Sequence, residues 1–596
     1  MASNDRIGDR GLSCEPIYLT DMDNSTPASA ISEAPKHQSW RSMAYETEDG
    51  LSGAMLMAGP ETAAPDVTYK VNVSGWHAVS IGVYGARRHD VGIMVRLSDD
   101  DTFHILSLPE VPRPTGGLGG KMLEVHDPGI HELYWRTTDL TGQGIVIGQE
   151  QWAAAPGEGP GSYACQESRI AYIKLVPVTD SEVAEVKADR DQSETKRLFV
   201  HNDSHGVHVN PRPTTAEEIR RHVEPYRDSD IARLYWESGM GDLLHYFTKI
   251  GRIPSYYGLE DYVGSNYRWG AESWRALQEQ DIDPFRVALE HSHEIGIEFH
   301  ASYRVAGFHF PPQHDHFDYG STFYDHHPEW RAVDREGNVT PRLSYAHEGV
   351  RKFVIALLRE MAGYDIDGVC LLYNRRPPLV EYDAPLVDGF KQHYGEDPRQ
   401  LADDDPRWLS YKARTLTQFH REVREAMQDE AQKQGRRPVK ITAVVLSTEQ
   451  ENLYNALDIK ALIDEELVDT LIPYSSEPNL NSMTHSWTDP HDADYFVSKT
   501  KNSSCELAVN LMPRHLSAEE YRSRAAGLYD AGVESFFFWD SDVHQARSNN
   551  ANNWNGLMRL GHRDEVKAWV QSDQPPLSMP SAPLTLLGDW DLAYET

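Results

Sequence analysis

The chain has 596 residues, of which 39% are hydrophobic and 25% are charged, a composition typical of soluble globular proteins. Because a single hydrophobic core stops growing at roughly 250–300 residues, we expect at least two domains. Acidic residues outnumber basic ones by 92 to 57, which gives a formal net charge of −35. A charge of this sign repels phosphate backbones and anionic lipids, so we expect neither a nucleic-acid nor a membrane partner.

The sequence contains no motif for a leader peptide, a membrane span or a cofactor. Its amino-terminal residues lack the basic segment and apolar run of a secretory signal, and no segment approaches ~18 consecutive apolar residues. We therefore expect a cytoplasmic protein, although a secreted form with its leader trimmed would look the same. No GxGxxG or GxxxxGK[ST] loop follows a predicted strand, and the four cysteines form no CxxC pair. We expect neither a cofactor nor a bound metal.

The amino-terminal third of the chain has the texture of a β-sheet protein. Residues 1–45 are polar and irregular and predict an arm. Residues 46–180 contain many short runs of β-branched and aromatic residues, separated by Gly, Pro and Asp turns. Short strands without intervening helices indicate an antiparallel β-sandwich. Residues 181–196 are charged and predict a linker or connecting helix.

From residue 197 to residue 570, apolar runs alternate with amphipathic helical patterns. Continuous apolar runs are typical of parallel strands whose two faces are both covered. Eight such units predict an α/β fold of the (β/α)8 barrel type with long loops, followed by a carboxyl-terminal extension over residues 571–596. A doubly wound open sheet is the alternative, but it lacks its usual phosphate-binding loop here. The predicted strands are 197–201, 231–236, 297–303, 368–373, 439–445, 469–474, 506–512 and 535–540.

The carboxyl ends of these strands are rich in carboxylates, aromatic rings, amides and guanidinium groups. In (β/α)8 enzymes the loops after the strands meet on one face and carry the chemistry. Aromatic rings stack on the apolar faces of sugars and polar groups bind their hydroxyls, so this composition indicates a carbohydrate site. The predicted substrate-binding residues are Trp236, Tyr303, Arg304, Tyr373, Asn374, Arg375, Arg376, Tyr474, Asn510 and Trp539.

The segment DIDGVCLLYNRRPP, which contains the fourth predicted strand, resembles the family-10 glycosyl-hydrolase-like barrel proteins. The positions that match the signature of that family are Asp367, Gly368, Leu371, Arg375 and Pro377. Residues 327–338 and the helix that follows them are also similar to that family, and the similarity spans residues 197–570. The resemblance implies a (β/α)8 glycoside hydrolase, and the amino-terminal β region is similar to carbohydrate-binding sandwiches.

The chain departs from the family pattern at Leu372, where the family has Asp. Leucine can neither donate a proton nor attack a sugar carbon, so the catalytic carboxylates must come from other positions. Glu449, after the fifth strand, is the first candidate for the proton donor, because a carboxylate beside a pocket wall has its pKa raised by desolvation. Asp540, next to Trp539, is the first candidate for its partner. The remaining candidates are Asp203, Glu237 and, on the loop after the fourth strand, Asp383.

We therefore predict a glycoside hydrolase that acts on an oligo- or polysaccharide. Arg304, Arg375 and Arg376 suit an acidic or sulfated sugar, or instead pair with neighbouring acids. Three alternatives stay open. One is a carbohydrate-binding barrel that lost catalysis together with the strand-4 Asp. Another is a metal-dependent enzyme, because residues 201–208 and 308–327 are rich in His and Asp. The third is a lyase that removes a proton from a uronic acid.

Overall fold

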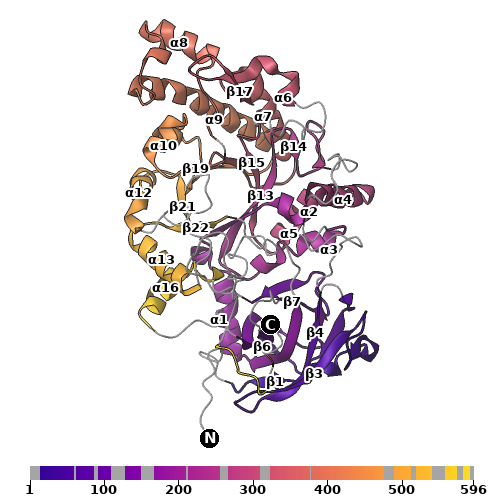
Figure 1. Cartoon of the computed structure of the whole chain (residues 1–596). Coiled ribbons are helices and arrows are strands. Elements are labelled where there is room, and N and C mark those ends of the chain that lie inside the picture. Colours follow the sequence, from indigo (N-terminus) through magenta and orange to yellow (C-terminus); the bar gives the residue numbers. More distant parts are fainter. Residues whose placement is uncertain are drawn as a thin grey trace.

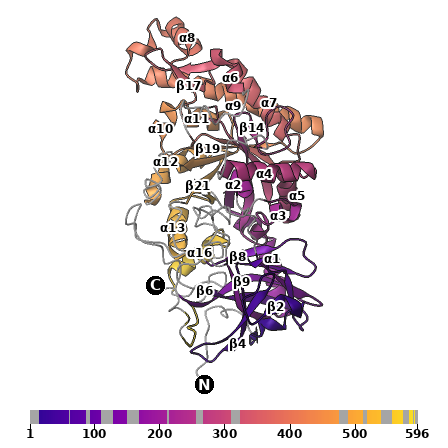
Figure 2. The same cartoon turned by 45° about the vertical axis from the view of Figure 1, so that its right-hand side comes forward.

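A β-rich domain is joined by a helix to a (β/α)8 barrel in the computed structural model (Figures 1 and 2). The structure describes residues 14–59, 62–85, 92–108, 128–149, 167–209, 213–254, 266–308, 323–375, 377–474, 489–511, 518–539, 557–572, 582–588 and 590. Within these ranges, no helix combines the length and the apolar character needed to cross a membrane.

The β-rich domain consists of two sheets around a common core. The larger sheet has the strand order β2-β3-β4-β11-β6-β9, with β1 paired to β11, and the smaller sheet has the order β5-β10-β7-β8. Leu56 and Ile81 of the larger sheet and Ile93 and Ile145 of the smaller one belong to the same buried cluster. The strands are β1 (Ile17–Leu19), β2 (Ile31–Ser32), β3 (Trp40–Glu46), β4 (Ser52–Ala58), β5 (Val67–Lys70), β6 (Trp76–Gly85), β7 (Gly92–Leu97), β8 (His104–Ser107), β9 (Gly129–Asp139), β10 (Gly144–Gly148) and β11 (Ser168–Pro177).

This domain extends beyond the bounds that the sequence indicated. Strands β1 and β3 belong to the larger sheet, although we expected an irregular arm up to residue 45. In β3 only Trp40 and Tyr45 are buried, so the segment lacks the apolar run by which a strand is recognised. At the other end of the chain, Leu584 pairs its backbone with Ile130 of β9. The carboxyl-terminal extension therefore returns to the β-rich domain.

Eight parallel strands form a closed barrel. Each strand pairs with the next one along the chain, and β12 pairs with both β13 and β22, which closes the ring. All eight predicted strands are present, and the closed ring excludes the open sheet. A short strand, β14 (Leu243–Leu244), forms a hairpin with the end of β13. The barrel strands are β12 (Leu198–Asn202), β13 (Ile231–Met240), β15 (Glu298–Arg304), β18 (Gly368–Leu372), β19 (Lys440–Leu446), β20 (Thr470–Tyr474), β21 (Glu506–Asn510) and β22 (Ser535–Phe538).

Helices surround the barrel strands (Figure 1), and local sequence explains several of their ends. Asp283 accepts a hydrogen bond from a first-turn N–H of α5, and Pro284 occupies that turn. Helix α9 begins after Asp405 and ends before Gly435, whose φ of 62° suits glycine. The helices are α1 (Asp180–Arg190), α2 (Ser204–Val209), α3 (Ala216–Arg220), α4 (Asn266–Glu279), α5 (Pro284–Glu294), α6 (Phe323–His326), α7 (Glu348–Met361), α8 (Ala384–Tyr394), α9 (Pro406–Gln434), α10 (Glu449–Tyr454), α11 (Ile459–Asp464), α12 (Asp494–Thr500), α13 (Ala518–Asp530) and α16 (Arg563–Val570).

Side chains of the barrel strands alternate between two cores. Val200, Leu234 and Val369 face the helices and belong to the largest buried cluster. Their neighbours in the strands fill the inside of the barrel. This interior cluster consists of Phe199, Tyr235, Cys370, Leu372, Val444, Ile472, Tyr474, Ala508, Phe537 and Trp539. Between β15 and β18 the chain also forms a hairpin of β16 (Arg331–Val333) and β17 (Val339–Leu343).

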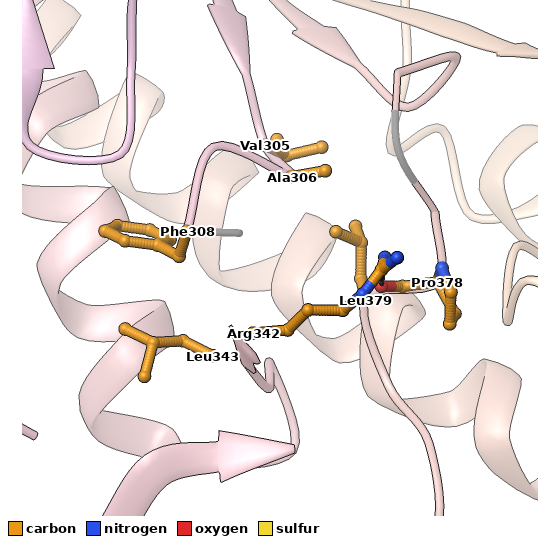
Figure 3. A pocket seen from close by; sticks show the side chains of 7 residues that line it. All are labelled: Val305, Ala306, Phe308, Arg342, Leu343, Pro378 and Leu379. Atoms are coloured by element: carbon orange, nitrogen blue, oxygen red, sulfur yellow. Dashed lines mark hydrogen bonds between the residues drawn. The ribbon is translucent and has the colours of Figure 1, made fainter. Parts of the chain in front are cut away.

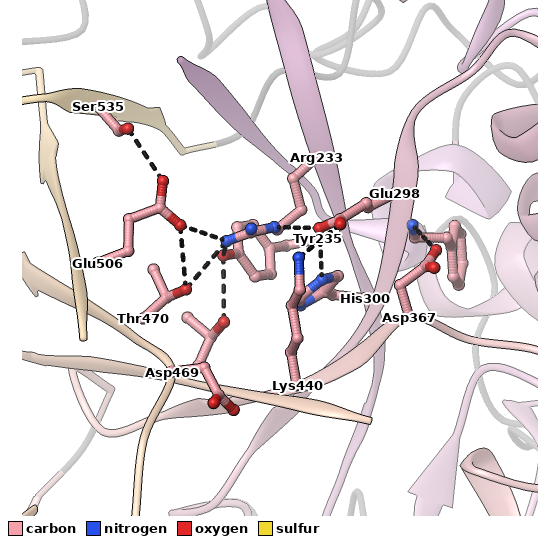
Figure 4. A network of polar contacts seen from close by, with 12 residues as sticks. Arg233, Tyr235, Glu298, His300, Asp367, Lys440, Asp469, Thr470, Glu506 and Ser535 are labelled. Carbon is pink, nitrogen blue, oxygen red and sulfur yellow. Dashed lines mark hydrogen bonds and ion pairs between the residues drawn. The ribbon is translucent and has the colours of Figure 1, made fainter. Parts of the chain in front are cut away.

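A polar network lies inside the barrel at the amino-terminal ends of the strands (Figure 4). Arg233 of β13 forms ion pairs with Glu298 of β15 at 3.0 Å and with Glu506 of β21 at 3.3 Å. It also donates a hydrogen bond to Thr470 of β20 at 3.0 Å, and Lys440 of β19 contacts Glu298 at 2.5 Å. The network therefore connects strands on different sides of the barrel.

The junction between the two domains contains a charged cluster. His562 lies between Asp189 of α1 and Asp230, which precedes β13, with its ring nitrogens 2.7 Å from an oxygen of each. Burial alone would lower the pKa of His562, but the hydrogen bonds to Asp189 and Asp230 outweigh burial and raise the pKa to about 9. At neutral pH His562 is therefore charged and donates to both carboxylates.

Candidate active site

The carboxyl ends of β12, β13 and β15 bring Asp203, Glu237 and Arg304 together. Arg304 donates a hydrogen bond from Nε to Oε2 of Glu237 at 2.7 Å. Its Nη2 lies 2.6 Å from the same oxygen and 3.1 Å from Oδ2 of Asp203. Two carboxylates that are distant in the sequence therefore share one guanidinium group.

The carboxyl group of Glu237 holds its proton unusually tightly. Only 2% of the residue is exposed, and this burial raises the pKa to about 8, because the charged form loses its solvation. Arg304 opposes the shift, whereas the nearby charge of Asp203 adds to it. With a pKa near 8, most molecules carry the proton at neutral pH. Glu237 can therefore serve as a proton donor.

The backbone around Glu237 is held by its neighbours. The hydroxyl of Ser204 donates to the carbonyl oxygen of Glu237 and lies 2.7 Å from Nδ1 of His245. A β-bulge follows between Glu237 and Gly239, and such bulges turn side chains near active sites. Gly239 has a φ of 130°, and a Cβ there would collide with the carbonyl oxygen of Leu243. Only glycine fits this position.

A stack of planar groups lies next to Glu237. The His201 ring packs on the Trp539 ring, with centroids 4.0 Å apart and planes 10° from parallel. The Arg375 guanidinium carbon lies 5.0 Å from the centroid of Trp539. Nε2 of His201 is 3.8 Å from Oε2 of Glu237. Tyr474 also contacts Trp539, with centroids 5.3 Å apart, so both predicted aromatic residues lie inside the barrel.

Three buried amides around the barrel mouth make no hydrogen bonds within the described part of the chain. They are the side-chain amides of Asn202 at the end of β12, Asn374 after β18 and Asn510 at the end of β21. Each is at most 4% exposed, and an unsatisfied buried polar group costs about 1–3 kcal/mol. Hydroxyl groups of a bound molecule would satisfy them. Asn374 and Asn510 were among the predicted substrate-binding residues, whereas Asn202 and His201, at the end of the first predicted strand, were not in that set.

The other predicted aromatic residues have a different environment. Trp236, Tyr303 and Tyr373 belong to the core between the strands and the helices. The Tyr303 hydroxyl donates to the carbonyl oxygen of Gly241 at 2.8 Å, and the Tyr373 hydroxyl hydrogen-bonds His420 at 2.9 Å. The structure therefore does not bring these three rings to Glu237. Each is one residue away from a side chain that faces the barrel interior or mouth.

Two of the predicted carboxylates lie apart from this centre. Glu449 is exposed in the first turn of α10, where it accepts a hydrogen bond from Tyr495. The desolvation that we expected there is absent, because water reaches the carboxylate. Asp383 is 1% exposed, but it accepts hydrogen bonds from Val333 N, Glu381 N and the Ser344 hydroxyl. These bonds give Asp383 a structural role between β16 and α8.

Two predicted residues, Arg376 and Asp540, lie outside the described residues, as does most of the histidine-rich segment 308–327. Within the described ranges, no group of three or more His, Cys, Asp or Glu side chains is arranged to hold a metal ion. Leu372 is one of the apolar side chains inside the barrel, so strand β18 contributes the amide of Asn374 rather than a carboxylate.

A small pocket opens between the end of β15 and the segment after β18 (Figure 3). Its volume is about 10 Å³, which is room for a single water molecule. The pocket is thus too small for a sugar chain. The residues that line it are Val305, Ala306, Phe308, Arg342, Leu343, Pro378 and Leu379.

No family model and no curated protein matches this chain. Among solved structures, the PgaB (BpsB) glycoside hydrolase domain from Bordetella bronchiseptica is similar over 61% of this chain and 99% of its own, at 11% identity and a TM-score of 0.40. Alpha-L-fucosidase isoenzyme 2 from Paenibacillus thiaminolyticus is similar over 63% and 50%, at 12% identity and a TM-score of 0.39. A ruminal GH26 endo-beta-1,4-mannanase is similar over 94% and 97%, at 10% identity and a TM-score of 0.28.

These similar structures are glycoside hydrolases by name, and the similarity to them is low. The barrel of the present chain is defined by its own strand pairing, which closes eight parallel strands into a ring. The fold therefore places the protein among the (β/α)8 barrels. Resemblance at this level does not extend to the reaction, which depends on the side chains at the strand ends.

Proposed function

We propose that this chain is a glycoside hydrolase in which Glu237 donates a proton to the glycosidic oxygen. The observation that carries the proposal is the buried carboxyl group of Glu237, whose pKa of about 8 keeps it protonated at neutral pH. Cleavage of a glycosidic bond needs such an acid, because the departing sugar oxygen is a poor leaving group until it is protonated.

Asp203 supplies the second carboxylate in this proposal. Its side chain is 21% exposed, and the same Arg304 nitrogen lies 3.1 Å from Asp203 and 2.6 Å from Glu237. Because Oδ2 of Asp203 and Oε2 of Glu237 contact the same nitrogen, these two oxygens lie at most about 6 Å apart, which fits the close carboxyl pair of retaining enzymes. Asp203 then attacks the sugar carbon, and the reaction retains the configuration of that carbon.

The groups around this pair are those that bind sugars. The side-chain amides of Asn374 and Asn510 are buried and lack partners within the described residues. A sugar brings several hydroxyl groups that both donate and accept hydrogen bonds, so it can satisfy the N–H and the C=O groups of these amides. Asn202 and His201 join this set from the neighbouring strand β12.

The test is the Glu237→Gln variant, assayed on a panel of 4-nitrophenyl and alkyl glycosides of both anomeric configurations. We expect kcat to fall by about 10²–10⁴-fold on alkyl glycosides, whose leaving group needs a proton, and much less on substrates with a good leaving group. The basic limb of the pH–rate profile, near pH 8 in the wild type, should disappear. The product formed first should keep the anomeric configuration of the substrate, as seen by NMR.

Glu279→Gln makes the same change at an exposed position of α4 and should leave all rates unchanged. Loss of activity in Glu449→Gln, with full activity in Glu237→Gln, would overturn the proposal in favour of the assignment made from sequence. Sugar binding without release of any product, in the wild type, would instead identify a non-catalytic carbohydrate-binding barrel.

A further inference from the structure

Arg375 is a cation at the barrel mouth that forms no ion pair within the described part of the chain. Its Nε is buried and makes no hydrogen bond there, and its guanidinium lies over Trp539. The chain has 92 acidic residues for 57 basic ones, so carboxylate partners are abundant. Arg233 and Arg304, which also face the barrel interior or mouth, each contact two of them.

Burying the N–H of a charged group without an acceptor costs free energy that the folded chain does not recover. The cost is recovered when an oxyanion binds, because the planar guanidinium can donate two parallel hydrogen bonds to a carboxylate or a sulfate. The Trp539 ring beneath Arg375 holds the guanidinium plane in place. Arg375 is therefore suited to bind the carboxylate or sulfate group of a ligand.

The position of Arg375 connects it with the proposed proton donor. Trp539, over which it lies, stacks on His201, and His201 is 3.8 Å from Glu237. The positive charge of Arg375 also acts on the Glu237 carboxyl group, where it favours the ionised form. A group that binds to Arg375 therefore lies in the same site as the bond that Glu237 would protonate.

We propose that the substrate is an anionic sugar, whose carboxylate or sulfate group is bound by Arg375. This inference rests on the proposed function, since it names the class of sugar that the same site accepts. Arg304 already pairs with the carboxylate of Asp203 and donates a hydrogen bond to Glu237, which leaves Arg375 as the group that selects for charge. A carboxylate and a sulfate can both accept two hydrogen bonds from a guanidinium group. Matched substrates show which of the two the site prefers.

The experiment compares the wild type with Arg375→Met and Arg375→Lys on matched 4-nitrophenyl glycosides. Glucuronide and glucoside form one pair, galacturonide and galactoside a second, and the 6-sulfated and unsulfated glucosides a third, each in both anomeric forms. We expect the wild type to prefer an anionic member, and Arg375→Met to lower kcat/KM on that member by about 10–100-fold. The rate on its neutral counterpart should change less than about threefold. Arg375→Lys should recover part of the loss, because it keeps the charge but not the planar fork.

Arg414→Met, at an exposed position of α9, is the matched control and should leave every rate unchanged. Calorimetric binding of glucuronate, galacturonate and glucose 6-sulfate, with glucose and galactose as references, is measured in parallel on wild type, Glu237→Gln and Arg375→Met.

If the wild type hydrolyses neutral glycosides and Arg375→Met lowers all rates equally, the substrate class is wrong and the proposed function stands. If nothing is hydrolysed but an anionic sugar binds through Arg375, the proposed function is wrong and the anion site stands. If the wild type neither hydrolyses a glycoside nor binds an anionic sugar, both the proposed function and the anion site are wrong.

Discussion

Opposing effects act on the carboxyl group of Glu237. Removal from water favours its neutral form, Arg304 favours its charged form, and the charge of Asp203 again favours the neutral one. Desolvation is the largest of the three, so the pKa lies at about 8. At the scale of single residues, the candidate chemistry thus depends on burial more than on which charged groups lie nearby.

The raised pKa of Glu237 predicts a pH-dependent stability. The folded state binds the proton up to about pH 8, whereas the unfolded chain releases it near the usual value of 4.5. The contribution to stability is therefore fully present below pH 4.5 and is lost as the pH rises through 8. In Glu237→Gln the free energy of unfolding should fall less between pH 5 and pH 9 than in the wild type. Each unit of pKa difference is worth roughly 1.4 kcal/mol.

Urea denaturation at the two pH values measures this difference. Glu279→Gln, which removes an exposed carboxylate, should keep the wild-type pH dependence. An unchanged pH dependence in Glu237→Gln would mean that Glu237 is ionised in the folded protein at neutral pH, contrary to the environment described above.

At the scale of elements, the barrel strands are joined at their amino-terminal ends by the network around Arg233. Burial alone would raise the pKa of Glu298, but its hydrogen bond with His300 and the charge of Arg233 lower that pKa well below its usual range. The network is internal to the barrel and lies at the opposite end of the strands from Glu237 (Figure 4). It therefore contributes to stability rather than to the candidate site.

Glu298→Gln should destabilise the barrel at pH 7 by about 1–3 kcal/mol, because Arg233 and Lys440 lose a charged partner. The lowered pKa means that the contribution of Glu298 is present above pH 4.5 and is lost as the pH falls through the folded-state value. The difference between variant and wild type should shrink in acid, as measured by denaturation at pH 7 and pH 3. Addition of Arg233→Met should restore part of the stability, and a further loss would contradict this account.

At the scale of the whole molecule, separate contacts join the β-rich domain to the barrel. His562 lies between Asp189 of α1 and Asp230 of the barrel. Glu217 of α3 accepts a hydrogen bond from Phe103 N at 3.1 Å. The segment around Leu584 pairs with Ile130, and Gly129 beside it leaves no room for a Cβ. The two domains are therefore expected to unfold together.

His562→Gln should weaken this coupling. The pKa of His562 is raised to about 9, so its contribution is fully present below pH 6.5 and is lost as the pH rises through 9. Calorimetry at pH 7 should show the single wild-type transition broaden or divide in the variant, with a midpoint roughly 1 °C lower for each kcal/mol lost. The wild type above pH 9.5 should resemble the variant. His393→Gln, at an exposed position of α8, should change neither property.

The fold was largely accessible from the sequence because its signals are local. The eight barrel strands are continuous apolar runs, and each is present within a few residues of its predicted bounds. Strands β1, β2 and β3 were missed, since few of their side chains are buried. Parallel strands in a closed barrel all end on the same face, and Asp203, Glu237 and Arg304 meet there, whereas Trp236, Tyr303 and Tyr373 lie in the core between the strands and the helices.

What the sequence determined by itself was therefore a closed α/β barrel after a β-rich domain, with Asp203, Glu237 and Arg304 among the residues at its mouth. Only the tertiary structure decided which side chains meet. Strand side chains alternate between two faces, so Glu237 points into the barrel while Trp236 points into the helical layer. The tertiary structure also buries Glu237, which raises its pKa, and leaves Glu449 exposed to water. Solvent access depends on chain segments that are distant in sequence, so the sequence alone does not indicate it.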